Sequence, residues 1–332
     1  MRFLGLLLVL VAILAAGIWM FRTPDSDIAE LEAKYGGPPS QFITLPLGER
    51  VHIRDQGNPA GRTLVLLHGS SASLHTWEPW VALLGDEFRI ITLDLPGHGL
   101  TGPVPGCDYS VECAVRLVDD LVEYLGLDHF VIGGNSFGGN VSWRYALAHG
   151  TKVDGLILSD AGGGPNLNPA PLTLAFRLAG IPVVNHLLEL FTPRSMVKQG
   201  IEDATSVEGF ATEEKIDRYW LLSRRPGNRT AMRMRFTVPE YSGLYHDQLA
   251  ELDIPTLIIW GREDGFVDLA DGEWFGRTIP GAIMSIYDGV GHLPMAEVPE
   301  LSAADTRTFL QGLPTLATEP ATIQEVAPAN AG

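Results

Sequence analysis

Residues 134–139 read Gly134-Asn135-Ser136-Phe137-Gly138-Gly139, at the junction between an apolar strand pattern, HFVIG, and a helical pattern. A serine between two glycines at such a junction is typical of a tight strand-to-helix turn, where a strained backbone leaves no room for bulky neighbours. The turn exposes the Ser136 hydroxyl at the C-terminal edge of a sheet. It also directs the Phe137 amide and the helix N-terminus toward developing negative charge. A purely structural glycine turn fits the pentapeptide alone, but the flanking strand and helix favour a nucleophile.

A serine hydroxyl is a poor nucleophile at neutral pH, so it needs a base, and the base needs a partner that fixes its tautomer. His292 follows the last strand pattern in Gly289-Val290-Gly291-His292, and the glycines let its ring reach toward Ser136. Two aspartates that follow strand patterns are candidates for the partner acid, Asp264 and Asp160, with Glu263 and Asp268 as lesser ones. Because aspartates after strands are often only turn or cap residues, this choice needs a test.

Short apolar runs alternate with helical patterns after residue 40, which predicts an α/β fold with a mostly parallel sheet covered by helices on both faces. FITLP and VHIRD form an expected antiparallel pair around Leu47-Gly48, and six further runs complete an eight-stranded sheet. These runs are TLVLLHG, FRIITLDLPG, HFVIGGN, VDGLILSDA, IPTLIIWG and AIMSIYDG.

One long insertion interrupts the alternation. Residues 163–248 contain no strand-like run, and segments such as LTLAFRLAG, VNHLLELF and EEKIDRYWLLSR have helical patterns. We therefore expect a helical cap at 163–248 over a core formed by residues 41–162 and 249–313, since so long an insertion does not fit a plain loop. The Pro- and Ala-rich residues 314–332 predict a disordered tail.

The first 22 residues predict a membrane anchor or signal segment. Residues 3–21, FLGLLLVLVAILAAGIWMF, carry no charge and match the thickness of a bilayer core as one helix. We expect an uncleaved single-pass transmembrane helix, with the catalytic domain periplasmic or extracellular; cleavage near Ala15-Ala16-Gly17 and a buried core helix are the alternatives. Residues 23–40 are expected to be a linker with one amphipathic helical piece.

The chain resembles the α/β-hydrolase superfamily, on motifs that extend from about Phe42 to Leu313. GGNSFGG resembles the nucleophile turn, LLHGSSAS the oxyanion segment, DLPGHG the following loop, and WGREDGFV and GVGHLPMAEVPE the acid and histidine segments. The likeness is to capped esterases and carbon–carbon bond hydrolases, because Ser70 follows His68-Gly69 where the HGGG lipases have glycine. The resemblance implies Ser136 as nucleophile, Asp264 as acid and His292 as base, with the Ser70 and Phe137 amides as the oxyanion hole.

The amino-acid composition limits the kinds of binding partner that we expect. The formal charge of −17 argues against nucleic-acid binding, which needs clustered Lys and Arg. We expect a small-molecule, ester-like substrate, no metal and no organic cofactor, and a membrane contact only through the N-terminal helix. Cys107 and Cys113 fit either a local disulfide or two free thiols. The sequence does not determine the oligomeric state.

The leading function expected is hydrolysis of a small or medium carboxylic ester through an acyl-enzyme. Hydrolysis of a carbon–carbon bond or of a lactone is the alternative. A third possibility is aminoacyl cleavage, in which Glu213 and Glu214 would bind an amine. A non-catalytic binding module is disfavoured because every triad member has a candidate. Haloalkane dehalogenase and epoxide hydrolase activities are disfavoured, because those relatives use an aspartate at the turn where this chain has Ser136. The side chains considered for the pocket walls are Trp77, Phe137, Phe176, Phe191, Trp220, Phe236 and Leu293, and those considered for a substrate carboxylate are Arg224, Arg225, Arg233 and Arg235.

Overall fold

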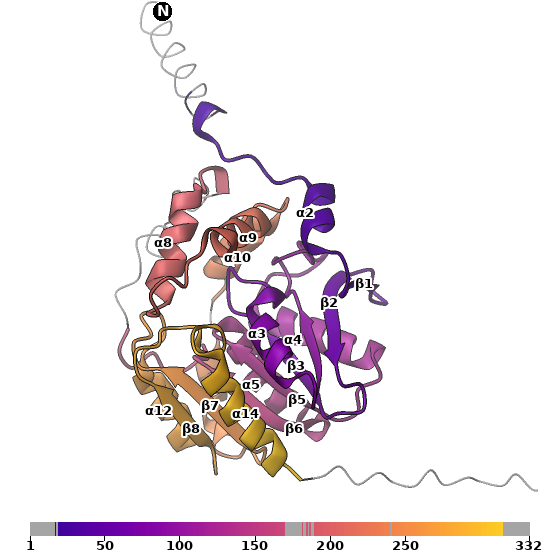
Figure 1. Ribbon diagram of the computed structural model, residues 1–332, viewed down its shortest axis with the longest axis vertical. Helices are drawn as coiled ribbons and strands as arrows, with labels where there is room; N and C mark the ends of the chain where they lie inside the picture. The colour runs from indigo at the N-terminus through magenta and orange to yellow at the C-terminus, as the bar shows by residue number, and fades with distance from the viewer. Residues whose placement is uncertain are drawn as a thin grey trace, which may run out of the picture.

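Eight strands form one sheet in the computed structural model of the chain, in the order β1-β2-β4-β3-β5-β6-β7-β8 (Figure 1). The structure describes residues 17, 19–169, 181, 184, 186, 189–239 and 241–314. β2 runs antiparallel to β1 and β4, and all other neighbours are parallel, so the predicted mostly parallel eight-stranded sheet is confirmed. The strands are β1 (Ser40–Thr44), β2 (Arg50–Gly57), β3 (Thr63–Leu67), β4 (Arg89–Leu93), β5 (Phe130–Asn135), β6 (Val153–Ser159), β7 (Thr256–Gly261) and β8 (Ile283–Tyr287).

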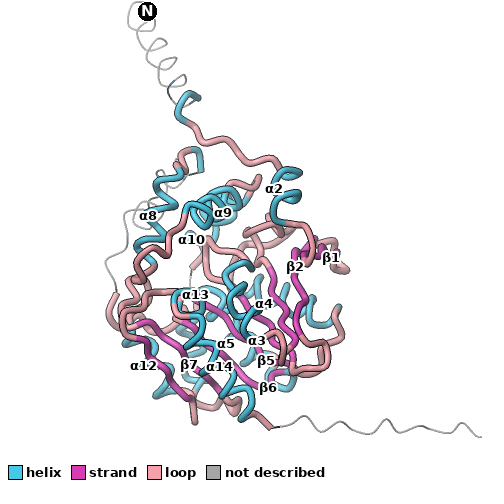
Figure 2. Tube along the Cα trace, viewed as in Figure 1, coloured by secondary structure: helices cyan, strands magenta, loops and turns pink. Residues whose placement is uncertain are grey.

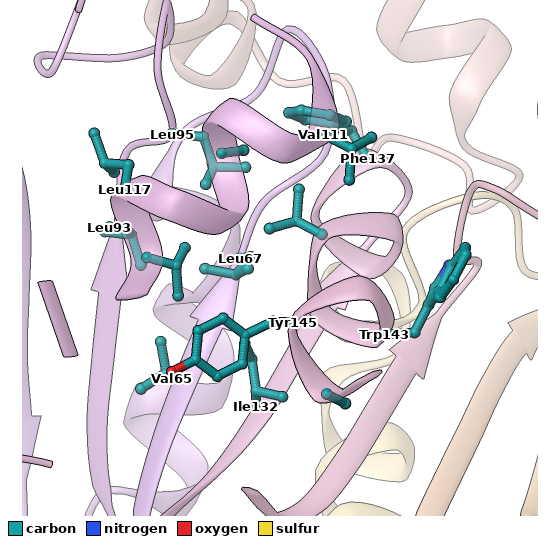
Figure 3. Packing of buried hydrophobic residues seen from close by; sticks show 14 of the residues in the cluster. Val65, Leu67, Leu93, Leu95, Val111, Leu117, Ile132, Phe137, Trp143 and Tyr145 are labelled. Atoms are coloured by element: carbon teal, nitrogen blue, oxygen red, sulfur yellow. The ribbon is translucent and has the colours of Figure 1, made fainter. Parts of the chain in front are cut away.

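Helices cover both faces of the sheet because the central strands are apolar on both sides. On β3, Val65 and Leu67 pack into one buried cluster, and Leu64 and Leu66 into another on the opposite face. The first cluster includes side chains of α4 (Val111–Tyr124), α5 (Phe137–Ala148) and α12 (Leu269–Thr278), part of which Figure 3 shows. The second includes side chains of α3 (Glu78–Leu84) and α14 (Pro299–Gly312).

Of the helical elements described between β6 and β7, we call four the cap helices. They are α8 (Arg194–Ala204), α9 (Glu213–Ser223), α10 (Asn228–Thr237) and α11 (His246–Leu249). No strand occurs among the described residues of 160–255, and α8, α9 and α10 group together at one end of the sheet (Figure 2). The predicted helix LTLAFRLAG lies outside the described residues. The division into a core at 41–162 and 249–313 and a cap at 163–248 remains our proposal.

The remaining helical elements are short. Five of them connect or flank the parts already named: α2 (Ile28–Tyr35), η1 (Leu74–Trp77), η2 (Gly150–Lys152), η3 (Ser242–Tyr245) and α13 (Pro294–Glu297). The helical piece expected in the linker is α2. Asp27 caps its N-terminus, because the Asp27 side chain accepts a hydrogen bond from the Glu30 amide at 3.0 Å.

Residues 23–26, which we call the strap, pair with the cap. The Thr23 amide donates to the Leu190 carbonyl at 2.7 Å, and the Ser26 amide donates to the Arg224 carbonyl at 2.9 Å. Figure 1 shows this part of the chain passing over the cap helices before it reaches α2. Side-chain bonds from the cap to the strap add to these contacts, so the segment is part of the folded unit.

The prediction of an N-terminal transmembrane helix is wrong for the part of the chain that the structure describes, and we do not retain it. None of the helices described there combines the length and the apolar character needed to cross a bilayer. A span needs about 20 consecutive apolar residues in a helix. Of residues 3–21, only Gly17 and residues 19–21 are described, and the rest of the run lies outside the described residues. The single-pass anchor and the periplasmic or extracellular placement that depended on it are corrected with it.

Candidate active site

The C-terminal ends of the parallel strands meet along one edge of the sheet, and the site forms there. The register pairs Leu67 of β3 with Gly134 of β5, and Asn135 of β5 with Ser159 of β6. The segments that follow β3, β5, β6, β7 and β8 therefore emerge beside one another, although they are far apart in the sequence. The predicted site residues Ser70, Ser136, Phe137, Asp264 and His292 all follow these strand ends.

Ser136 has the strained backbone that the glycine pattern predicts. Its φ is 53° and its ψ is −116°, a conformation that side-chain-bearing residues rarely adopt. A Cβ on Gly134 would stand 2.3 Å from the Gly138 carbonyl group, and a Cβ on Gly138 would stand 2.3 Å from the Leu67 carbonyl oxygen. Both glycines are therefore required for β5 to turn directly into α5 with the serine at the corner.

His292 and Asp264 form a hydrogen-bonded pair. The His292 Nδ1 lies 2.7 Å from the Asp264 Oδ2, and both side chains are almost fully shielded from solvent. The other carboxylate oxygen, Oδ1, accepts from the amides of Phe266 at 2.7 Å and Val267 at 3.1 Å. This arrangement assigns the ring proton to Nδ1 and leaves Nε2 as the proton acceptor, which is the tautomer that a general base requires.

Ser136 and His292 line the same cavity, and a side chain adjacent to the serine ties their segments together. The Asn135 Nδ2 donates to the His292 carbonyl at 2.9 Å and to the Ser159 carbonyl at 3.2 Å. The structure thus brings three predicted side chains, separated by up to 156 positions in the chain, to one place.

The segment His68-Gly69-Ser70 runs directly against the nucleophile turn. A Cβ on Gly69 would stand 2.8 Å from the Asn135 Oδ1 and 3.1 Å from the Ser136 Cβ. His68 is fully buried and holds this segment, because its Nδ1 donates to the Gly69 carbonyl at 2.7 Å and its Nε2 accepts from the Leu95 amide at 3.0 Å. Burial lowers the pKa of His68, which favours the neutral ring that these two bonds need.

Phe137 begins α5, so its amide belongs to the first helical turn, whose N–H groups have no acceptor within the helix. Gly69 and Ser70, which follow β3, line the same cavity as Ser136. Backbone from two segments therefore flanks Ser136, as an oxyanion hole requires.

A cavity of about 290 Å³ extends from these residues toward the cap, and its walls are mostly apolar. The core contributes the segments around Gly69, His98 and Ser136, together with Phe266 and Leu293. α8, α9 and α10 supply the opposite wall, with the side chains Met196, Val197, Ile201, Ala204, Tyr219, Ser223, Asn228, Arg229, Met232, Arg233 and Phe236.

The cations that line this cavity are already paired. Arg233 forms an ion pair with Glu189, and both side chains are about one-fifth exposed. Arg229 donates to the Thr23 carbonyl at 2.9 Å and to the Asp25 carboxylate at 2.6 Å, so it joins the strap to the cavity wall. Burial, helped by the nearby His68, lowers the pKa of His98 to about 3, so this ring stays neutral near neutral pH.

The other acid candidates have different partners. The Glu263 Oε2 accepts from the Gly289 amide at 2.7 Å, and the Asp268 Oδ1 accepts from the Ala270 amide at 2.8 Å to cap α12. Asp160 is fully buried, and its Oδ1 accepts from the Gly261 amide at 2.9 Å.

Few of the predicted wall and cap residues reach the cavity. Phe236 and Leu293 line it, whereas Trp77 lies in the core and the Trp220 Nε1 donates to the Thr192 carbonyl at 2.9 Å. Phe137 packs in the core cluster; Phe191 does not line the cavity, and Phe176 lies outside the described residues.

Of the four arginines, only Arg233 lines the cavity. Arg224 donates to the Pro24 carbonyl at 2.8 Å, and the Arg235 guanidinium stacks 4.3 Å from the centre of the Phe137 ring. Glu213 pairs with Arg194 at 2.6 Å, and Glu214 is exposed, so neither contributes to the cavity wall.

Sequence reasoning missed Glu297, which holds the histidine segment. Its Oε2 accepts from the amides of Ser206, Val207 and Gly291 at 2.7, 3.1 and 3.1 Å, and its Oε1 accepts from the Leu293 amide at 3.1 Å. The amides on both sides of His292 are therefore fixed by one side chain. Its only sequence signal is its place within GVGHLPMAEVPE, where nothing in the spacing marks the glutamate.

Two side-chain groups in the described residues have the composition of a metal site. Asp160, Asp264 and His292 have one potential ligand atom each within 4.8 Å of one another, but they could bind a cation only if the His292–Asp264 hydrogen bond were given up. The second group is Cys107, Asp108 and Cys113, and its cysteines are joined in a disulfide bond, so they offer no thiolate.

The sequence pattern of the alpha/beta hydrolase fold family matches residues 62–299 of the chain. The 2-hydroxy-6-oxononadienedioate/2-hydroxy-6-oxononatrienedioate hydrolase of Cupriavidus pinatubonensis is 31% identical over 267 residues, which cover 76% of this chain and 89% of that protein.

Solved structures of hydrolases share the fold. An esterase from Rhodococcus sp. ECU1013 is 27% identical with a TM-score of 0.67, over 83% of this chain and 99% of that one. The 2-hydroxy-6-oxo-6-phenylhexa-2,4-dienoate hydrolase from Rhodococcus sp. strain RHA1 has a TM-score of 0.71 at 22% identity, over 82% and 99% of the two chains. At that identity the second likeness concerns the fold alone.

Proposed function

Because this chain belongs to the alpha/beta hydrolase fold family and is an enzyme of the hydrolase class, we propose that it is a serine hydrolase whose Ser136 attacks a carbonyl carbon of a small-molecule substrate. One observation carries the proposal: the 2.7 Å bond between His292 and Asp264, in a cavity that is also lined by a serine on a strained turn. A neutral imidazole with its Nδ1 proton fixed is able to accept the serine proton at Nε2.

The proposed reaction has two halves. The Ser136 Oγ bonds to the carbonyl carbon while His292 takes the hydroxyl proton, and the resulting oxyanion accepts hydrogen bonds from the Phe137 and Ser70 amides. Each such donor contributes roughly 3 kcal/mol to the stability of the transition state. The bond to the leaving group breaks, and that group takes the proton from His292. Water, deprotonated by His292, then releases the acid and restores Ser136.

We propose a carbon–carbon bond next to a ketone as the bond that is cleaved. The support is the relative from Cupriavidus pinatubonensis, which matches this chain over most of both sequences and carries a name of that class. Cleavage of this bond restricts the substrate. The leaving carbon departs as a carbanion, so the substrate must be able to delocalise the negative charge on that carbon until His292 protonates it.

A carboxylic ester is the second candidate, and the cavity favours it. The relative's name describes a doubly acidic substrate, whereas Arg229 and Arg233 here already have carboxylate partners and the walls are mostly apolar. An apolar acyl group fits such walls without displacing an ion pair. Initial rates on a vinylogous 1,5-diketone, on its monocarboxylate and dicarboxylate analogues, and on p-nitrophenyl esters of increasing chain length would rank the two candidates. Turnover of esters alone would reject the first candidate.

Labelling of the folded enzyme with a fluorophosphonate tests the proposal itself. We expect stoichiometric labelling of the wild type and none of Ser136→Ala, because only an activated serine displaces the fluoride. Ser142, buried in α5 and bonded to the Gly138 carbonyl at 2.7 Å, gives the matched control Ser142→Ala, which should label normally. Unlabelled wild-type protein that retains its native circular dichroism would reject a serine mechanism.

A further inference from the structure

Asp160 has no part in the reaction above, yet it lies against the groups that do. It follows β6 directly, is fully buried, and has a φ of 43°. An aspartate tolerates this left-handed conformation better than most residues do, but the conformation still costs free energy. A strained, buried, ionisable residue at the edge where the site forms needs an explanation.

The contacts of Asp160 lead to the catalytic acid. Its Oδ1 accepts from the Gly261 amide at 2.9 Å, and the Ser159 hydroxyl lies 3.2 Å from its Oδ2. One polar atom from each of Asp160, Asp264 and His292 lies within 4.8 Å of the others, so the two carboxyl groups are close neighbours. Two carboxyl groups can share a hydrogen bond only if one of them keeps its proton.

The surroundings decide which carboxyl is protonated. Asp264 has two amide donors on Oδ1 and the His292 ring on Oδ2, all of which stabilise its charge. Asp160 has one amide and one hydroxyl. Burial raises the pKa of Asp160 well above its usual range, and the neighbouring charge of Asp264 raises it further. Tyr287 also lies near enough to interact electrostatically with Asp160, and its hydroxyl donates to Asp305 at 2.7 Å.

We propose that Asp160 is a positioning residue, an uncharged carboxylic acid that donates its proton to the Asp264 carboxylate and so fixes the group that orients His292. The proposal rests on the proposed function, since it gives Asp264 the role of the triad acid. In this arrangement Asp264 is held from three strand ends: by Asp160 after β6, by amides of its own loop after β7, and by His292 after β8. The Asp264 carboxylate then cannot rotate away while His292 gains and loses its proton.

Substitution by asparagine separates this role from that of a charged acid. Asp160→Asn keeps an NH₂ donor toward Asp264 and an oxygen acceptor for Gly261, so we expect kcat to stay within about threefold of wild type with an unchanged pH profile. Asp160→Ala removes the donor. Its kcat should fall by about 10- to 100-fold, the range for partners that orient a reacting group, with little change in KM. The acidic limb of its kcat/KM profile should move to higher pH, because a carboxylate with one donor fewer attracts the imidazole proton more strongly.

Asp264→Asn is the reference, with an expected loss of about 10⁴-fold in kcat. If Asp160→Asn loses activity to the same degree while it remains folded, Asp160 is charged and the proposal is overturned. If Asp160→Ala has wild-type kcat and pH profile, the residue is only structural and the proposal is again overturned. Should the alanine variant not fold, Asp160→Ser and Asp160→Asn still provide the comparison. Failure of the proposed function is recognised separately, since wild-type Ser136 would then resist the fluorophosphonate.

Discussion

Individual polar groups hold His292, the proposed base, in place. His292 has its ring fixed by Asp264, its carbonyl by Asn135, and its amide by the carbonyl of Ala204 at 2.7 Å, a residue at the end of the cap helix α8. Glu297 fixes the amides on either side of it. The base therefore depends on contacts from both the core and the cap.

Loss of Glu297 should reduce activity without removing any reacting group. In Glu297→Ala, four amides lose their acceptor, and we expect kcat to fall by about 100-fold as the His292 segment loosens. The free energy of unfolding should fall by about 3 kcal/mol or more, because each buried unpaired amide costs 1–3 kcal/mol. Glu297→Gln retains one acceptor oxygen and should lie between the two. Rates of fluorophosphonate labelling and urea melts would measure both effects; labelling of Glu297→Ala at the wild-type rate would contradict this role.

The sequence points to the proposed reacting residues because their signals are local. Ser136 is marked by glycines two positions away, and His292 by its place after a strand. The carboxylate that is hydrogen-bonded to the His292 ring is that of Asp264, and the competitor Asp160 lies close to both. The residues that hold this arrangement, Asn135, Asp160 and Glu297, carry no local signal, because their partners lie far away in the sequence and become neighbours only when the sheet has formed.

Among the elements, strands were predictable and the N-terminal segment was not. A buried parallel strand appears as a short apolar run whatever its neighbours are. The strap has no such pattern. Its residues suggest a linker by composition, and their partners on the cap, such as the carbonyls of Leu190, Leu221 and Arg224, lie far away in the sequence. The transmembrane prediction had the same weakness, because it relied on an apolar run alone.

Arg229 of α10 is expected to contribute strongly to the attachment of the strap to the cap, because it bonds to both Thr23 and Asp25. Arg229→Ala removes two hydrogen bonds of a guanidinium that is only 14% exposed, so we expect a loss of about 1–3 kcal/mol in the free energy of unfolding. We also expect faster proteolysis within residues 19–26. The control Asp25→Asn disturbs only the half-exposed end of the pair and should cost less than about 1 kcal/mol. Equal effects of the two variants on melting and on trypsin cleavage would mean that the strap is not held through Arg229.

At the scale of the whole molecule, the β4 side of the sheet buries several neutral histidines. Burial lowers the pKa of His75 to about 3 and, with a contribution from His68, that of His98 to about 3; the pKa of His68 is also lowered by burial. Asp94, fully buried, accepts from His52 at 2.7 Å and from the amides of Leu74 and Leu100 at the centre of this region. These buried rings cannot take up a proton in the folded state, so acid favours the unfolded state, in which they can.

This burial predicts that the protein loses stability in mild acid. An unfolded histidine takes up a proton near pH 6.5, whereas His75 and His98 in the folded chain do so only near pH 3, so between these values the unfolded state binds more protons. The neutral histidines lower the free energy of unfolding only below pH 6.5. Well below that pH, each such histidine lowers it by about 1.4 kcal/mol per pH unit. Asp160, with its raised pKa, opposes this trend by one proton. His75→Gln keeps polar contacts within reach of Ser73 and Arg54 but cannot be protonated. Urea melts should therefore show that the variant loses less stability than the wild type, by about 0.7 kcal/mol between pH 7 and 6 and by about 1.2 kcal/mol between pH 6 and 5. An unchanged slope would mean that His75 is already charged in the folded protein, contrary to its burial.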